Sequence, residues 1–246
     1  MKMNRKHLIV VVAMFGFYFT SWPIHAWAQS VPTYTSIKNN FISFRPYLGG
    51  GFVSTDINNS GDFNGTEIIL GSSSPEVDMV PAVGRNGGFM GLVGVRHGDY
   101  ALEVSYWHSD QPVTFQSAQS SGVYQSLNVD LKRYFFTSLP TQPFLLLGVS
   151  FPWITFENAS SPEPINPSET ASATYSGFGF NLGAGLEIYT GSAFSIFGEV
   201  IQRWAEFNTV HGYYEQSNVI LTSHGNQIDL RGDGVEFAVG ASIETF

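Results

Sequence analysis

The sequence predicts an all-β fold: an eight-stranded antiparallel transmembrane β-barrel with four long outer loops and three short periplasmic turns. Eight segments alternate between apolar side chains and polar or small ones with a period of two, which is typical of strands that separate two environments. The seven connections between these segments alternate in length, and the first and last are long. The strands also carry few charges, since only 13% of the 246 residues are charged while 15% are aromatic.

The amino terminus predicts export. Three basic residues precede an apolar run over residues 8–22, and an A-x-A cleavage signal follows at 26–28. We interpret this segment as a secretory signal peptide rather than an uncleaved anchor, because the run is short and ends in a cleavage site. The predicted parts of the chain are a signal peptide over 1–28, a periplasmic tail over 29–40 and an outer-membrane β-barrel over 41–246.

Composition excludes several classes of function. The chain has no cysteine, so it has no disulfide, no cysteine-ligated zinc and no cysteine nucleophile. Without residues 1–28, three of the eleven Lys and Arg residues are removed and no acid is. The remaining eight basic and twenty acidic residues give a formal charge of −12, which argues against a nucleic-acid partner.

The boundaries of the strands follow from the alternation and from clusters of Gly, Ser, Asn, Asp and Pro between the segments. In order, the predicted strands cover residues 41–53, 87–96, 100–108, 123–135, 144–156, 174–189, 194–204 and 234–246. The alternation does not decide which face of the second strand points inward. The four long loops are predicted over residues 54–86, 109–121, 157–173 and 205–233, and residues 218–230 are a candidate hairpin in the last of them.

The sixth and seventh strands form the clearest hairpin. Their faces match if Thr190 pairs with Phe194, which leaves a three-residue loop in which Gly191 supplies the positive φ that such loops need. This register places Asn181 opposite Arg203. One face of the hairpin is then a continuous apolar band, and the other carries small and charged residues.

The apolar face is predicted to point toward lipid. The alternative is a soluble barrel of the lipocalin type, in which the same period would place aliphatic side chains inside and charges outside. A soluble barrel needs a generously charged outer surface, whereas these strands carry few charges and many glycines. Aromatic residues at the strand ends also fit the girdles of a membrane barrel.

The interior of an eight-stranded barrel is only wide enough to be filled by side chains. The charges predicted to point inward are Arg45, Glu103, Asp130, Lys132, Glu187, Glu199, Arg203, Glu236 and Glu244. Because a lone buried charge is unfavourable, these residues must pair. Their heights on neighbouring strands suggest three pairs: Glu103 with Lys132, Arg45 with Glu244, and Arg203 with Glu236.

This pattern predicts a packed polar core, and the alternative is a polar plug that opens as a narrow channel for ions or small solutes. A wide diffusion porin is disfavoured, because such pores need roughly sixteen strands.

The first long loop contains a candidate calcium site. Asp56, Asn58, Ser60, Asn64 and Glu67 occupy relative positions 1, 3, 5, 9 and 12 of an EF-hand-like pattern, with a glycine at position 6. This pattern places hard oxygen ligands around a tight turn. The alternative is an ordinary polar loop, since no helices flank the segment. No other cofactor is predicted.

Two other loop motifs bear on function. Arg231, Gly232 and Asp233 form the tripeptide that some adhesins use for integrins, and the alternative is a turn before the last strand. His108 and Ser109 are neighbours on a strand, so their side chains point to opposite faces and do not form a catalytic dyad by themselves. We therefore expect no enzyme, and a barrel enzyme acting on lipid or peptide is a second alternative.

Residues 41–246 resemble the small outer-membrane β-barrel proteins of Gram-negative bacteria, the class of the OmpA membrane domain and the opacity-type proteins. The resemblance lies in the signal peptide, the eight-strand layout and the terminal Phe246. It implies a location in the bacterial outer membrane and contact with outer-membrane lipid and the barrel-assembly machinery. One departure is that Phe246 is offset by one residue from the apolar positions before it, so either a bulge returns it to the outer face or the assembly signal is read differently.

The predicted function is therefore that of a structural or surface-interaction protein, adhesin- or antigen-like. Its loops would contact an extracellular or host-surface partner, because loops on a rigid scaffold are where binding residues concentrate.

Overall fold

The computed structural model divides the chain into two units, Met1–Asn39 and Asn40–Phe246, and all the described residues lie in the second. The described residues are 44–57, 62–63, 67–70, 76–79, 82–115, 118–156, 173–191, 193–212, 215–220, 222–223, 226–227 and 230–244. The predicted signal peptide, the predicted tail over 29–40 and Phe246 lie outside them. Among the described residues, no helix is long and apolar enough to cross a membrane.

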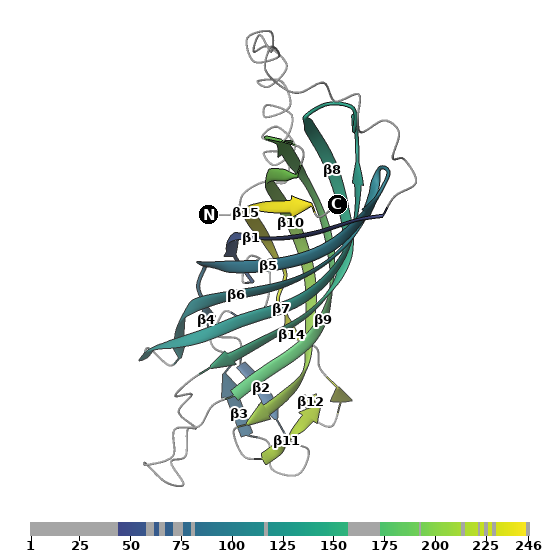
Figure 1. The fold of residues 1–246 in the computed structure, drawn as a ribbon. Helices are drawn as coiled ribbons and strands as arrows, with labels where there is room; N and C mark the ends of the chain where they lie inside the picture. Colours follow the sequence, from purple (N-terminus) through teal and green to yellow (C-terminus); the bar gives the residue numbers. More distant parts are fainter. Residues whose placement is uncertain are drawn as a thin grey trace, which may run out of the picture. The chain divides into compact units, whose positions relative to one another are not determined.

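Eight antiparallel strands form a closed barrel, which confirms the predicted fold class (Figure 1). These strands are β1 (Arg45–Thr55), β5 (Asn86–His97), β6 (Tyr100–Phe115), β7 (Ala118–Tyr134), β8 (Thr141–Phe156), β9 (Ala173–Tyr189), β10 (Phe194–Gly212) and β15 (Gly234–Glu244). Each pairs with the next along the chain, and β15 pairs with β1 to close the ring. We call the end with the short connections after β5, β7 and β9 the turn end, and the opposite end the loop end.

The large apolar side chains point outward and the polar or small ones inward. On β1, the side chains of Leu48 and Phe52 are 54% and 75% exposed, whereas Tyr47 is buried. On β9, Phe180 is exposed and its neighbour Asn181 is fully buried. The apolar face is therefore the outer face, as predicted, and the lipocalin-type arrangement is wrong for this chain.

The predicted register of the β9–β10 hairpin is confirmed. Asn181 lies opposite Arg203, and Thr190 N donates a hydrogen bond of 3.0 Å to the carbonyl oxygen of Phe194. The prediction of a positive φ at Gly191 is wrong. Among the described residues, positive φ occurs at Gly98 (60°) and Phe136 (56°), in the other two turns.

The second predicted loop, residues 109–121, is largely strand. Strands β6 and β7 continue as a paired ribbon to Phe115 and from Ala118. The polar composition of this segment hid an alternation that persists, since Ser109, Gln111 and Val113 are buried between exposed neighbours. Side chains that line a polar lumen have the same composition as a loop, which explains why this prediction was wrong.

The first and last long loops also contain short strands. In the first, β2 (Glu67–Leu70) pairs with β3 (Glu76–Met79), and β4 (Ala82–Val83) pairs with β6. In the last, β10 forms a hairpin with β11 (Glu215–Ile220), and a short antiparallel hairpin lies within the predicted range 218–230. The remaining pieces are β12 (Thr222–Ser223), β13 (Asn226–Gln227) and β14 (Leu230–Arg231), of which β12 pairs with β13 and β14 with β10.

Glycines on the barrel strands make room for inward aromatic rings on the neighbouring strand. Three such pairs stand directly opposite each other: Tyr47 and Gly94, Phe144 and Gly185, and Phe197 and Gly240. A Cβ added at Gly185 would lie 2.3 Å from Phe144 Cζ and 2.6 Å from the carbonyl oxygen of Gly198. The glycine content of the strands therefore reflects close packing inside a narrow barrel.

We predict that Gly185→Ala destabilises the barrel by about 1–3 kcal/mol, because the new methyl group overpacks the space filled by the Phe144 ring. Urea unfolding of the refolded protein in phospholipid vesicles measures the change. Gly91→Ala is the matched control, since Gly91 is an exposed strand glycine with no atom within 4 Å of an added Cβ. Equal unfolding free energies for the two variants would contradict this packing account.

Candidate functional site

The lumen is the most highly organised polar region of the described residues. Six carboxylic acids point into it together with four basic residues. The acids are Glu103, Asp130, Glu187, Glu199, Glu236 and Glu244, and the bases are Arg45, Arg96, Lys132 and Arg203. These side chains form contacts at successive levels between the turn end and the loop end.

A chain of polar contacts crosses the lumen at the turn end. The Arg96 guanidinium donates to Gln142 Oε1 and to Tyr189 Oη, both at 2.6 Å. The Tyr189 hydroxyl donates to Glu244 Oε1 at 2.7 Å, and Arg45 Nη1 lies 3.0 Å from Glu244 Oε2. These contacts link β5, β8, β9, β15 and β1. Side chains therefore fill this end of the lumen.

Sequence analysis did not include Arg96 among the inward charges. Its strand, β5, has apolar side chains on both faces, so alternation alone gave no direction. The structure turns Met90, Leu92 and Arg96 inward and leaves Phe89 and Val93 exposed. The strand register would have identified Arg96, because it lies on the same face of β5 as the buried Met90 and Leu92, an even number of residues away.

Lys132 joins two carboxylates in the middle of the lumen. Its Nζ lies 2.9 Å from Glu103 Oε2 and 3.0 Å from Glu199 Oε2. Tyr47 Oη donates a further hydrogen bond of 3.0 Å to Glu103 Oε2. The same ammonium group lies 4.9 Å from the centre of the Phe144 ring, so its environment combines two ion pairs with a cation–π contact.

Glu187 borders a small cavity beside this cluster. Its Oε1 accepts hydrogen bonds from Ser195 Oγ at 2.5 Å and Ser242 Oγ at 3.3 Å. Among the described basic side chains, none forms an ion pair with it. The cavity leaves about 10 Å³ for the centre of a water molecule and is lined by aromatic rings as well as by Glu103 and Lys132. Such a volume is room for about one water molecule rather than for a solute.

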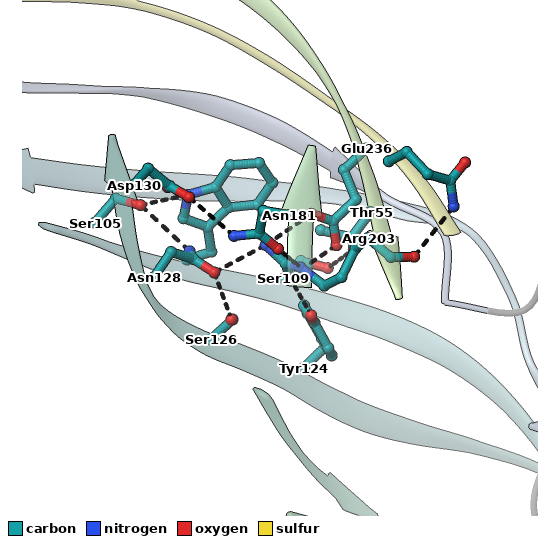
Figure 2. Close-up of polar contacts among 12 residues, drawn as sticks. Thr55, Ser105, Ser109, Tyr124, Ser126, Asn128, Asp130, Asn181, Arg203 and Glu236 are labelled. Carbon is teal, nitrogen blue, oxygen red and sulfur yellow. Dashed lines mark hydrogen bonds and ion pairs between the residues drawn. The ribbon is translucent and has the colours of Figure 1, made fainter. Parts of the chain in front are cut away.

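Arg203 is the centre of the next level toward the loop end (Figure 2). It forms a two-pronged ion pair with Glu236, in which Nη1 and Nη2 each lie 3.0 Å from a carboxylate oxygen. Its Nε donates to Asn181 Oδ1 at 3.0 Å, and Nη2 donates to Asn128 Oδ1 at 2.9 Å. It also donates a hydrogen bond to the Tyr124 hydroxyl. One guanidinium group thus connects β7, β9, β10 and β15.

Asp130 and the polar residues nearer the loop end complete this network. Asn181 Nδ2 donates to Asp130 Oδ1 at 3.1 Å, so Asp130 is linked to Arg203 through the amide of Asn181. Toward the loop end, Thr55 and Ser109 share a hydrogen bond of 2.7 Å, and Gln111 donates to both (Figure 2 labels Thr55 and Ser109). The polar network therefore extends to the mouth of the barrel.

An apolar cluster closes the loop end of the lumen. Its centre is Phe63 from the first long loop, whose ring is fully buried. That ring packs edge-on against Phe207 and Tyr175, with centroid distances of 5.0 and 5.9 Å. Phe63 O accepts a hydrogen bond of 3.0 Å from Val83 N, which holds the loop in place. Sequence analysis did not predict this contact, because nothing in the pattern of a polar loop places one aromatic residue inside a barrel mouth.

The structure shows how Arg231, Gly232 and Asp233 are arranged. Asp233 Oδ1 accepts a hydrogen bond of 3.2 Å from Ala205 N, and Oδ2 lies 2.7 Å from Arg231 Nη2. The Arg231 side chain is 58% exposed, whereas that of Asp233 is only 6% exposed. The hydrogen bond and charge of Asp233 raise the pKa of Arg231 above its usual value. These contacts fit a turn that joins β14 to β15 better than a presented recognition tripeptide.

The candidate calcium residues fall largely outside the described part of the chain. Asn58, Ser60 and Asn64 are not described, Asp56 follows the end of β1, and Glu67 begins β2. Within the described ranges, no group of three His, Asp or Glu side chains is arranged to hold a metal ion. Calcium binding stays a prediction.

The residues considered for catalysis do not come together. His108 lies on the outer face and stacks on Phe89 at 4.8 Å, while Ser109 is fully buried in the lumen. Nε2 of His108 lies 3.7 Å from Asp110 Oδ1, which is longer than a hydrogen bond. As predicted, the neighbouring His and Ser side chains point to opposite faces.

We predict that Arg203→Met destabilises the barrel by about 3–5 kcal/mol, because it leaves Glu236 buried without its ion-pair partner. Urea unfolding in vesicles measures the change, and adding Glu236→Gln to the same chain recovers part of it. Arg85→Met is the control, since Arg85 is an exposed arginine, and its effect is below about 1 kcal/mol. A similar small effect for Arg203→Met would contradict the central role of this residue.

Comparison with known proteins supports the fold. No protein-family model and no curated protein sequence matches the chain. The solved structure of the outer membrane protein OprG from Pseudomonas aeruginosa is similar, with a TM-score of 0.55, 11% identity, and coverage of 82% of this chain and 96% of OprG.

Two other solved structures resemble the chain at lower scores. Neisserial surface protein A has a TM-score of 0.46 and 9% identity, covering 82% of this chain and 96% of that one. The attachment invasion locus protein Ail of Yersinia pestis has a TM-score of 0.41 and 13% identity, covering 83% and 100%. Of these three structures, OprG has the TM-score above 0.5, and the fold comparison rests on it. The chain has the fold of the small eight-stranded outer-membrane β-barrel proteins.

Proposed function

We propose that the chain is an outer-membrane protein of a Gram-negative bacterium that acts at the cell surface through its loops, as an adhesin-like or structural barrel. In this proposal the turn end faces the periplasm and the loop end faces the outside of the cell. The outward apolar face of the barrel and the likeness to OprG support the location.

The observation that carries the proposal is the filling of the lumen. Polar contacts cross it at the levels of Arg96, Lys132 and Arg203, and the Phe63 cluster covers its mouth. A solute would have to break several buried ion pairs to pass, and each broken pair leaves an unfavourable buried charge. The interior is therefore best explained as a structural core, which leaves the loops as the functional region.

The loops contain paired strands that offer a surface for a partner. Paired strands in the first and last long loops, β2–β3 and β10–β11, give them backbone order beyond that of simple connections. The acidic residues of the loops would repel anionic partners and favour cationic ones. We therefore expect a partner that presents a basic or neutral surface.

Adhesion of intact cells tests the proposal. Gram-negative cells that express the chain are expected to bind cultured epithelial cells or immobilised matrix proteins better than cells without it. Replacing residues 67–79 or 215–227 by a short Gly-Ser linker is expected to reduce this binding roughly tenfold or more in at least one case. Ser138→Ala, an exposed change at the turn end, is the control that leaves binding unchanged. No difference between expressing and non-expressing cells would contradict an adhesin-like role.

A narrow channel is the alternative, and planar-bilayer recording distinguishes it. We expect the refolded protein to give no discrete conductance steps, because three polar levels block the lumen below Phe63. Phe63→Ala is expected to remain closed for the same reason. Discrete steps whose size changes in Lys132→Met or Arg203→Met would show that ions pass through the lumen, and they would contradict the filled-core account.

An enzyme is a weaker alternative for this chain. Of the described candidates, His108 lacks a hydrogen-bonded carboxylate or hydroxyl, and Ser109 is engaged with Thr55 and Gln111 in the lumen. Catalysis by a Ser–His pair needs both groups within hydrogen-bond reach. We therefore propose that the chain is not an enzyme.

A further inference from the structure

Two arginines on the outside of the barrel differ from the other described bases. Arg45, Lys132 and Arg203 form ion pairs with lumen carboxylates, and Arg231 pairs with Asp233. Arg96 is buried in the hydrogen-bonded network of the turn end. Arg85 and Arg133 are exposed, and among the described residues no carboxylate forms an ion pair with either.

Arg133 lies on the lipid-facing side of β7 near the turn end. Its cross-strand neighbours on the same face are Tyr100 on β6 and Leu145 on β8, which are 48% and 53% exposed. One step further into the barrel wall, Leu131 is also exposed. A cation therefore stands at the border of an otherwise apolar surface, and no carboxylate of the described residues forms an ion pair with it.

Aromatic rings hold the guanidinium at this height. Its Cζ lies 5.3 Å from the centre of the Phe135 ring and 5.8 Å from that of Tyr100. Arginine suits such a place, because it stacks on aromatic rings and still presents N–H groups that match the oxygens of a phosphate. Aromatic residues of this kind mark the interface of a membrane, at the level of the lipid head groups.

The adjacent turn adds a second, independent observation. Phe136 has a φ of 56°, a conformation that is costly for a bulky residue, and its side chain is 68% exposed. Leu139 in the same turn is 51% exposed, and its N–H donates 2.8 Å to Phe136 O. The turn thus holds two large apolar side chains outside the protein directly beyond Arg133. Such exposure is favourable where the acyl chains and head groups of a membrane cover it.

We propose that Arg133, with Tyr100 and Phe135, binds the phosphate of an anionic phospholipid in the periplasmic leaflet of the outer membrane. The inference rests on the proposed location of the chain. The guanidinium donates to the phosphate oxygens, the lipid's acyl chains lie along Leu131 and Leu145, and the turn with Phe136 enters the head-group region. The site sets the depth of the barrel in the membrane at its periplasmic rim.

Lipid titration of the refolded full chain in detergent micelles, followed by native mass spectrometry, tests this site. The probes are phosphatidylglycerol and a diacylglycerol with the same acyl chains but no phosphate. We expect the intact chain to bind phosphatidylglycerol about fivefold more tightly than diacylglycerol, the preference that one arginine near a lipid surface provides. Arg133→Gln is expected to remove this preference, and Arg133→Lys to keep part of it.

Arg231→Gln is the matched control, because it removes the same charge from an exposed arginine outside the barrel wall and leaves the preference unchanged. Heat-modified mobility in gels verifies that each variant is folded. The proposal is wrong if Arg133→Gln keeps the full preference, if diacylglycerol binds as tightly as phosphatidylglycerol, or if excess inorganic phosphate displaces the lipid completely. Because the readout is lipid binding, its failure is separate from a failure of the adhesion experiment.

Discussion

Every charge inside an eight-stranded barrel has to find its partner within the same lumen, because the wall faces lipid and the interior holds little water. This requirement accounts for the arrangement of Arg203, which connects its own strand to three others through Glu236, Asn181, Asn128 and Tyr124. It also accounts for Lys132, which neutralises two carboxylates at once. Such pairs are favourable only when all their members are in place, so the strands that carry them are tied to one register.

The same narrow interior explains why the strands need glycine. The rings of Tyr47, Phe144 and Phe197 each face a residue with no side chain on one neighbouring strand, and Gly94, Gly185 and Gly240 provide that room. Gly148 does the same for Asp130, whose Oδ1 would lie 1.9 Å from an added Cβ. Packing and electrostatics therefore act jointly at these four positions, where a large or charged inward side chain faces a glycine on the next strand.

Local patterns predicted the wall of the barrel but not the closure of its mouth. The period of two and a short turn were enough to predict the register of β9 and β10. The pairing of Arg45 with Glu244 was predictable because the first and last strands become neighbours when the ring closes. Arg96 was missed because its strand is apolar on both faces, and residues 109–121 were misread because lumen-facing polar residues resemble a loop. Phe63 was unpredictable for a different reason: its partners, Tyr175 and Phe207, come from distant strands, and no periodic signal links a loop residue to them.

The basic residues fall into two groups: those inside the barrel stabilise the fold, and those outside are exposed to a partner. Inside, arginine and lysine are bound by carboxylates or hydrogen bonds of the same chain, so they contribute to the fold and have no capacity left for a ligand. Outside, Arg85 stacks on Phe237 toward the loop end and Arg133 on Phe135 toward the turn end. Arg133 stands on the outer face of β7, whereas Arg85 lies in the connection between β4 and β5. The filled lumen and these two exposed arginines support our proposal that the barrel interacts with its surroundings through its outer wall and its loops, while its interior serves to hold both in place.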